Sequence, residues 1–267
     1  MTQLVTTLLT PFALTGRATL ALLDELGGMF IFLLQGLWRS LISPQWRKIA
    51  QQVYFIGVKS VYVIALIGLF TGMVLGLQGY YTLVKFGSEG LLGAAVSLSI
   101  IRELGPVLTA IMLTGRAGSS MAAEIGIMRI SEQIDALITM DINPMRFLIA
   151  PRLAASLLCF PLLTALFDVI GILGGYLTGV ILLGINPGVY FDRIDAAVEL
   201  TDVTGGFVKS LVFALLVAAI CCYEGYFTHT RPGGFGAKGV SLATTAAVVL
   251  SCVTILVADY VLTSFLL

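Results

Sequence analysis

Long apolar runs alternate with short polar stretches along this chain. A membrane-spanning helix needs about 20 mostly apolar residues, and five stretches reach that length: 60–84, 91–114, 153–183, 207–228 and 240–267. Pro161 lies inside the third stretch, where it favours a tilt or a kink. The pattern therefore predicts an all-α membrane protein with five transmembrane helices.

The first 50 residues follow a different pattern. Charged residues and glycines interrupt their apolar runs, and the region ends with the basic residues Arg39, Arg47 and Lys48. Such a segment is typical of an amphipathic helix that lies in the membrane interface. We therefore expect an N-terminal interfacial helix within residues 1–50, followed by a five-span membrane domain at 51–267. A sixth span within 1–50 is the alternative.

A short amphipathic stretch, MRISEQIDALITMDINP at 128–144, separates the second and third spans. Its apolar residues are spaced for one face of a helix, Ser131 is a suitable N-cap, and Asn143-Pro144 is suited to begin the next helix. The polar face is acidic, which suits anionic lipid head groups poorly. A protein partner is therefore the favoured contact. The apolar residues are Ile130, Ile134, Leu137 and Ile138, and the acidic ones are Glu132, Asp135 and Asp141.

Composition supports the membrane interpretation, and charge distribution orients the chain. The sequence is 58% hydrophobic and 11% charged, whereas soluble domains average about 25% charged residues. Its net charge of +0 gives no indication of a nucleic-acid partner. Basic residues mark cytoplasmic segments, and with the N-terminus inside, only Lys85 and Arg193 fall in outer loops. The inner basic residues are Arg39, Arg47, Lys48, Arg116, Arg129, Arg146, Arg152, Arg231 and Lys238.

Repeated small residues predict close helix packing. Glycines recur every four residues at 68–76 and 171–179, and Gly118, Ala122 and Gly126 share that spacing. Small residues at this spacing let helices approach closely. Each set suits either packing within the chain or the seam of a dimer.

An enzyme is not indicated. The single histidine, His229, lies in a predicted cytoplasmic loop, and the four cysteines lie in apolar runs without a C-x-x-C pair. GGFGAKG at 233–239 lacks the Ser or Thr that a phosphate-binding loop has after its lysine. The sequence therefore predicts a non-catalytic subunit with no metal site, no cofactor and no ATP site of its own.

Ionisable residues inside the spans are the strongest functional indication, because burying them in lipid is costly. They fit structural ion pairs or a polar-lined cavity for an amphiphilic solute, and Lys209 and Asp259 are placed to pair near the outer leaflet. One alternative is a self-contained ion-coupled transporter that uses Glu103, Asp168 and Lys209, although five spans divide poorly into inverted repeats. Another is a scaffold for a periplasmic ring. The residues are Arg102, Glu103, Asp168, Lys209 and Asp259.

The most specific pattern closely resembles the MlaE/YrbE family of ABC-transporter permeases. It is IIRELGPVLTAIMLTGRAGSSMAAEIGIMRISEQIDALITMDINPMRFLIAPRLAA at 100–155, with TGMVLGLQGY at 71–80 and DYVLTSFL at 259–266 in support. The resemblance covers essentially the whole chain.

The resemblance implies a homodimer in the bacterial inner membrane, with the N-terminus inside and the C-terminus periplasmic. It implies an MlaF-like cytoplasmic ATPase that binds ATP and Mg, a MlaB-like STAS protein and an MlaD-like MCE protein on the outer side. The implied function is ATP-driven phospholipid transport that maintains outer-membrane lipid asymmetry.

The resemblance also implies roles for individual residues. A coupling helix at about 129–141 would contact the ATPase, with Asp141 standing where many relatives have glycine or another small residue. The coupling residues are Arg129, Glu132, Asp135, Ala136 and Asp141. The residues expected to line the lipid cavity are Leu75, Leu77, Tyr80, Tyr81, Arg102, Glu103, Lys209 and Asp259.

Overall fold

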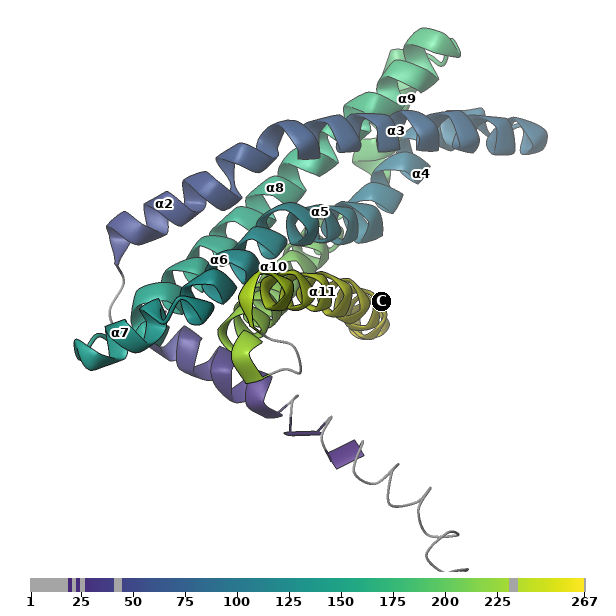
Figure 1. Cartoon of the computed structure of the whole chain (residues 1–267). Coiled ribbons are helices and arrows are strands. Elements are labelled where there is room, and N and C mark those ends of the chain that lie inside the picture. The colour runs from purple at the N-terminus through teal and green to yellow at the C-terminus, as the bar shows by residue number, and fades with distance from the viewer. Residues whose placement is uncertain (1–18, 21–22, 25–26, 41–44, 231–234, 267) are drawn as a thin grey trace, which may run out of the picture.

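The computed structural model describes residues 19–20, 23–24, 27–40, 45–230 and 235–266 (Figure 1). Within these residues every regular element is a helix. The α-helices are α2 (Trp46–Ile56), α3 (Val61–Leu83), α4 (Leu92–Ser99), α5 (Gly105–Leu113), α6 (Ser119–Ile130), α7 (Gln133–Thr139), α8 (Ala150–Tyr176), α9 (Pro187–Ala197), α10 (Leu200–Tyr226) and α11 (Gly236–Leu266).

Short π-helical or 3₁₀ segments join several of these helices. The π-helical segments are η4 (Ile100–Leu104), η5 (Thr114–Gly118), η6 (Met145–Ile149) and η7 (Leu177–Leu182). The 3₁₀ segments are η1 (Val58–Ser60), η2 (Val84–Phe86), η3 (Glu89–Leu91) and η8 (Thr228–Thr230).

Five continuous helical rods among the described residues are long and apolar enough to cross a membrane, which confirms the five predicted spans. They are Trp46–Phe86, Glu89–Ile130, Met145–Leu182, Leu200–Tyr226 and Gly236–Leu266. The chain is a multi-pass membrane protein.

Some rods are much longer than the apolar runs that predicted them. A rod of 41 residues is about 60 Å long at ~1.5 Å per residue, about twice the ~30 Å hydrocarbon core. Helix continues beyond the second apolar run into a segment with polar residues, which bond back to the preceding turn. Ser120 Oγ, for example, donates to the Arg116 carbonyl at 3.0 Å.

The N-terminal region packs against the C-terminal end of α10. Residues 27–40 are helical, and the buried Phe32 contacts the rings of Tyr223 and Phe227, with centroids 5.6 and 6.2 Å away. The helix α2 runs across residue 50, the expected domain boundary, and continues through η1 into α3. Much of the expected interfacial helix, including residues 1–18, lies outside the described residues.

Glycines hold α3 against α8 with backbones in contact. A Cβ at Gly72 would overlap the Gly171 carbonyl, and one at Gly68 would lie 3.1 Å from the Phe167 carbonyl. Gly118 likewise faces Cys221 on α10. The small-residue repeats therefore serve packing within the chain.

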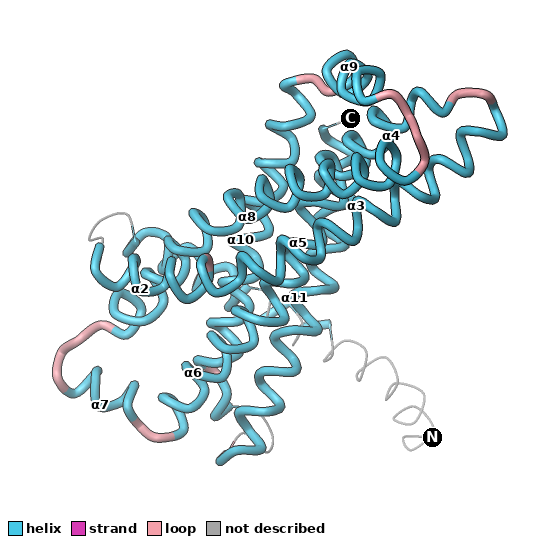
Figure 2. The backbone as a smooth tube through the Cα atoms, turned by 90° about the horizontal axis from the view of Figure 1, so that it is seen from above, coloured by secondary structure: helices cyan, strands magenta, loops and turns pink. Residues whose placement is uncertain are grey.

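The helix α9 lies at the opposite end of the molecule from α7 (Figure 2). Its Tyr190 is fully buried, close to Gly93 on α4 and Gly175 on α8. The tyrosine hydroxyl donates to the Ile172 carbonyl at 3.0 Å. The sequence predicted only an outer loop around Arg193, whereas the structure places a helix there that is anchored in the bundle.

The helix α7 is shorter than the predicted 129–141 because Arg129 and Ile130 belong to α6. The predicted cap at Ser131 is wrong. Glu132 occupies the N-cap with a left-handed backbone (φ 59°), and its side chain makes no cap hydrogen bond. Of the predicted apolar face, Ile134 and Leu137 are buried, whereas Ile138 is 52% exposed.

Backbone and side-chain hydrogen bonds fix the turn between α7 and the next helix. Ile142 N donates to the Leu137 carbonyl and Asp141 N to the Ile138 carbonyl, at 2.9 and 3.0 Å. This is a Schellman motif, with Asp141 in the left-handed conformation (φ 59°). Asn143 Oδ1 then accepts from Met145 N at 3.0 Å, which confirms the predicted cap of the next helix.

Candidate functional site

A proline in the second span leaves a backbone carbonyl that another helix satisfies. In an α-helix the carbonyl of Arg102 would accept from the N–H of residue 106, but Pro106 has none. The chain before it widens into the π-helix η4, which contains Arg102 and Glu103. Such bulges are frequent at functional sites. The Arg102 carbonyl instead accepts from Lys209 Nζ of α10 at 2.9 Å.

Lys209 organises one half of the site. Its side chain is 3% exposed, and its ammonium also donates to Glu103 Oε2 and Thr263 Oγ1, both at 2.7 Å. Asp259 on α11 lies 3.1 Å away, so the predicted Lys209–Asp259 pair is present. An ammonium has three donors, and all three are used. Lys209 therefore acts as an internal support rather than an open ligand group.

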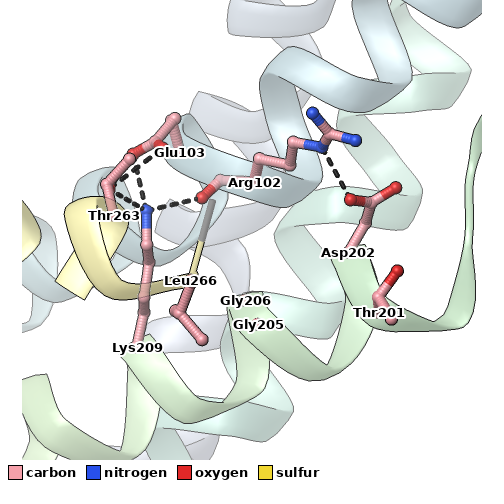
Figure 3. Close-up of a pocket in the computed structure, with 9 residues that line it drawn as sticks. All are labelled: Arg102, Glu103, Thr201, Asp202, Gly205, Gly206, Lys209, Thr263 and Leu266. Carbon is pink, nitrogen blue, oxygen red and sulfur yellow. Dashed lines mark hydrogen bonds and ion pairs between the residues drawn. The ribbon is translucent and has the colours of Figure 1, made fainter.

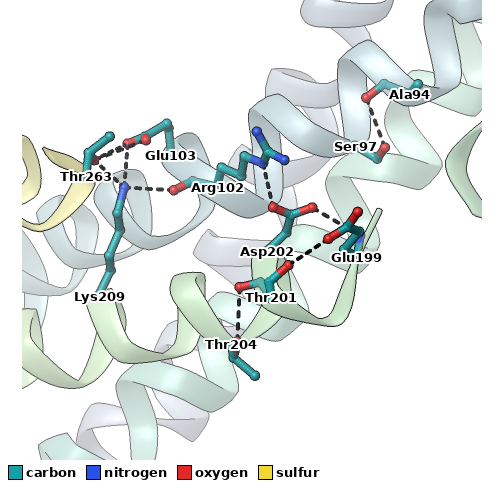
Figure 4. Close-up of polar contacts among 10 residues, drawn as sticks. All are labelled: Ala94, Ser97, Arg102, Glu103, Glu199, Thr201, Asp202, Thr204, Lys209 and Thr263. Atoms are coloured by element: carbon teal, nitrogen blue, oxygen red, sulfur yellow. Dashed lines mark hydrogen bonds and ion pairs between the residues drawn. The ribbon is translucent and has the colours of Figure 1, made fainter. Parts of the chain in front are cut away.

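Arg102 organises the other half. Its Nε donates to Asp202 Oδ1 at 2.7 Å, and its side chain is 41% exposed. Asp202 is fixed by a capping box at the start of α10, because its other oxygen accepts from Glu199 N at 3.1 Å. Figure 4 shows Arg102 reaching Asp202 while its carbonyl faces Lys209.

A pocket lies between the two halves (Figure 3). Gly206 lets α10 approach η4, since a Cβ there would lie 2.6 Å from the Ile101 carbonyl. The pocket joins carboxylates, a guanidinium and the apolar side chain of Leu266, a combination that fits the head-group end of an amphiphile. Its lining residues are Arg102, Glu103, Thr201, Asp202, Gly205, Gly206, Lys209, Thr263 and Leu266.

The predicted cavity residues divide into two groups. The structure brings Arg102, Glu103, Lys209 and Asp259 together, but the α3 residues lie elsewhere. Leu75 lines a separate groove with Gln78 and Ser99. Leu77 and Tyr81 are exposed, and Tyr80 is half-buried with its ring against that of Tyr81. Asp168 lies on α8 against Gly105 and outside the pocket lining.

A second polar cluster lies at the α7 end. Arg129 Nη1 pairs with Asp135 Oδ1 at 2.7 Å, and Arg129 Nε donates to His229 Nδ1 at 3.0 Å. Burial lowers the pKa of His229, and the neighbouring Arg129 charge lowers it further. Arg129 therefore ties α7 to η8, the segment between α10 and the next described helix. Glu132, Asp135, Ala136 and Asp141 are all exposed.

Sequence reasoning missed several of these groups. Asp202 had a readable signal, because Glu199 three residues earlier forms a capping box with it. Thr263 had none, since its role depends on Lys209, 54 residues away. Arg152 is also buried and pairs with Glu124 at 2.8 Å, although its position had indicated only a cytoplasmic charge.

Comparison with known proteins gives consistent matches over most of the chain. The family model described as Permease MlaE matches residues 49–265. A probable ABC transporter permease protein of Rickettsia bellii is 41% identical, covering 93% of this chain and 94% of that protein. The intermembrane phospholipid transport system permease protein MlaE of Haemophilus influenzae is 42% identical, covering 84% and 86%. The chloroplastic protein TRIGALACTOSYLDIACYLGLYCEROL 1 of Arabidopsis thaliana is 37% identical, covering 82% of this chain and 61% of that protein.

Proposed function

This chain belongs to the MlaE permease family, and on that premise we propose that it is the membrane subunit of an ATP-driven phospholipid transporter. It moves phospholipid between the inner membrane and a periplasmic MCE protein, and so maintains outer-membrane lipid asymmetry. The observation that carries the proposal is the ion-paired pocket built from Arg102, Glu103 and Lys209.

The pocket suits a phospholipid head group. Asp202 binds the Nε side of the Arg102 guanidinium, which leaves its Nη donors for a ligand. Guanidinium donors bind phosphate oxygens well, and often in pairs. Glu103, 39% exposed, offers acceptors on the other side. Acyl chains would lie along the surface of α3 that includes the exposed Leu77 and Tyr81 and the half-buried Leu75 and Tyr80.

The α7 end supports the coupling role. Glu132, Asp135 and Ala136 are exposed next to the exposed apolar residues Ile138 and Met140. An acidic surface with apolar neighbours suits a protein groove. Arg129 belongs to α6 and forms an ion pair with Asp135 on α7. A movement of α7 would therefore be transmitted to α6.

The assembly follows from the same premise. Two copies form a homodimer with an MlaF-like ATPase, which binds ATP and Mg and receives an MlaB-like STAS protein. An MlaD-like MCE protein sits at the α9 end. The chain lies in the bacterial inner membrane with the N-terminus inside and the C-terminus periplasmic. The helix at residues 27–40 lies in the membrane interface.

Glu132→Lys tests the coupling role, because Glu132 is exposed and forms no ion pair among the described residues. We expect the variant to fold but to lose co-purification with the ATPase and stimulation of its hydrolysis. Glu89→Lys, an exposed change in η3 near α9, is the matched control. Normal stimulation by Glu132→Lys would exclude α7 as the coupling helix.

Arg102→Ala tests the lipid pocket in proteoliposomes that contain the complete complex. We expect at least a tenfold loss of ATP-dependent phospholipid transfer, whereas Arg47→Ala, an exposed change on α2, should transfer normally. The rival ion-coupled transporter predicts gradient-driven transport without ATP. That result would replace the ABC-permease proposal.

A further inference from the structure

Three polar side chains on α5 and α8 each have a buried oxygen without a hydrogen-bond partner in the described part of the chain. They are Thr109 on α5, and Thr164 and Asp168 on α8. Helical hydroxyls often bond to the carbonyl of the preceding turn, as Thr114 does to Ala110 at 2.8 Å. Thr109 and Thr164 are almost fully buried and do not.

The three side chains lie along one seam. The Asp168 carboxyl packs on the backbone of Gly105, where a Cβ would overlap its Oδ1. Helix residues four apart share a face. Because α5 and α8 belong to consecutive spans that run in opposite directions, the step from Gly105 to Thr109 and the step from Asp168 to Thr164 lead to the same level. This spacing places the three side chains at neighbouring levels of the α5–α8 seam.

The charged side chains near this seam are engaged elsewhere. On α10, which packs against both α5 and α8, Lys209 binds Glu103, Thr263 and the Arg102 carbonyl. The segments α3 and α5 contain no Asp, Glu, Lys, Arg or His. In η4, Arg102 pairs with Asp202 and Glu103 with Lys209. Buried polar groups without partners are costly, and buried water typically makes about three hydrogen bonds to such groups.

We propose that Asp168, Thr164 and Thr109 form an internal water-binding site in the seam between α5 and α8. Water supplies donors to the carboxyl and both donors and acceptors to the hydroxyls. The site lies beside η4 and one turn from Pro161. The regular α-helical hydrogen bonding is interrupted in both spans at these points, by the π-helix in one and by the proline in the other. This inference does not depend on the transported substrate.

Radiolytic hydroxyl-radical labelling of the purified protein, read by mass spectrometry, tests the site because trapped water labels side chains that bulk water does not reach. We expect labelling of the buried neighbours Leu163 and Phe167 in the wild type and in Asp168→Asn, whose amide also binds water. The combined variant Thr109→Val, Thr164→Val and Asp168→Leu should lose most of that labelling. Thr114→Val, which removes a hydroxyl already bonded to the backbone, should keep it.

Thermal unfolding of each variant verifies that it is folded before labelling. A wild-type seam without labelling, or unchanged labelling in the combined variant, would overturn the proposal. A wild type whose unfolding midpoint rises in Na⁺ relative to choline, with the rise lost in Asp168→Asn, would assign the oxygens to a cation instead.

Discussion

Single side chains complete the backbone hydrogen bonding of other helices in this protein. Lys209 serves the carbonyl left by Pro106. Pro151 leaves the Phe147 carbonyl in the same way, and Lys48 Nζ lies 3.4 Å from it. Each lysine therefore acts as a connection between elements, in addition to carrying a charge.

Replacing Lys209 by Met should destabilise the protein strongly. The change leaves Glu103 and Asp259 without their cation and the Arg102 carbonyl without its donor, and breaking a buried pair costs about 3 kcal/mol or more. Thermal unfolding in detergent should show the loss, and Lys85→Met, at an exposed position, should unfold at the wild-type midpoint. Equal midpoints would mean that the network contributes no stability.

The His229 contact should weaken in acid. The pKa of His229 is lowered from its ordinary value of 6.5 in the folded protein, so the neutral ring is favoured by folding. Its contribution to stability is present above pH 6.5 and is lost as the pH falls through the lowered pKa. The difference in unfolding midpoint between wild type and His229→Asn should therefore shrink from pH 8 to pH 5. A constant difference would contradict the Arg129–His229 contact.

At the scale of elements, periodicity predicted what depends on local sequence. The five spans followed from runs of apolar residues, and the cap at Asn143 followed from Asn-Pro. The anchoring of α9 by Tyr190 was not predictable, because its hydrogen bond goes to Ile172 on another helix. The length of α7 was predicted incorrectly because Arg129 and Ile130 continue the backbone hydrogen bonding of α6. The polarity pattern of the sequence does not show where α6 ends.

The seam between α3 and α8 should not accept an added methyl group. Gly72→Ala places a Cβ against the Gly171 carbonyl, and overpacking costs about 1–3 kcal/mol. We expect a lower unfolding midpoint and a smaller monodisperse fraction in size-exclusion chromatography. Gly115→Ala, with no atom near the added Cβ, should match the wild type, and a normal Gly72→Ala would contradict the packing.

Asp141→Gly should leave stability unchanged or raise it slightly, because glycine adopts the left-handed conformation without strain. Ala136→Gly, inside α7, should lower stability by about 1 kcal/mol. Chemical or thermal unfolding should thus show a loss of stability for Ala136→Gly and none for Asp141→Gly. A loss at both positions would argue against the turn geometry at Asp141.

At the scale of the whole molecule, the site is made by three distant segments. Arg102 and Glu103 come from the second span, Lys209 from the fourth, and Asp259 and Thr263 from the fifth. The sequence indicated most of these residues, since charges inside apolar runs need partners. It did not indicate that Leu75 and Tyr81 lie apart from them, because that depends on how α3 packs.

The orientation of the molecule should appear in cysteine labelling. Gln133→Cys on α7 and Asp192→Cys on α9 are exposed positions at opposite ends. A membrane-impermeant maleimide should label Asp192→Cys in intact spheroplasts and Gln133→Cys only after permeabilisation. The reverse pattern would invert the proposed topology.

The bond between Lys209 and the carbonyl that Pro106 leaves also has an evolutionary consequence. A chain that loses the lysine but keeps the proline retains an unpaired carbonyl inside the membrane, whereas a chain that loses both can close an ordinary helix. Substitutions at positions 106 and 209 should therefore be correlated among related sequences. Sequences without the proline at 106 should be those in which the lysine at 209 is replaced.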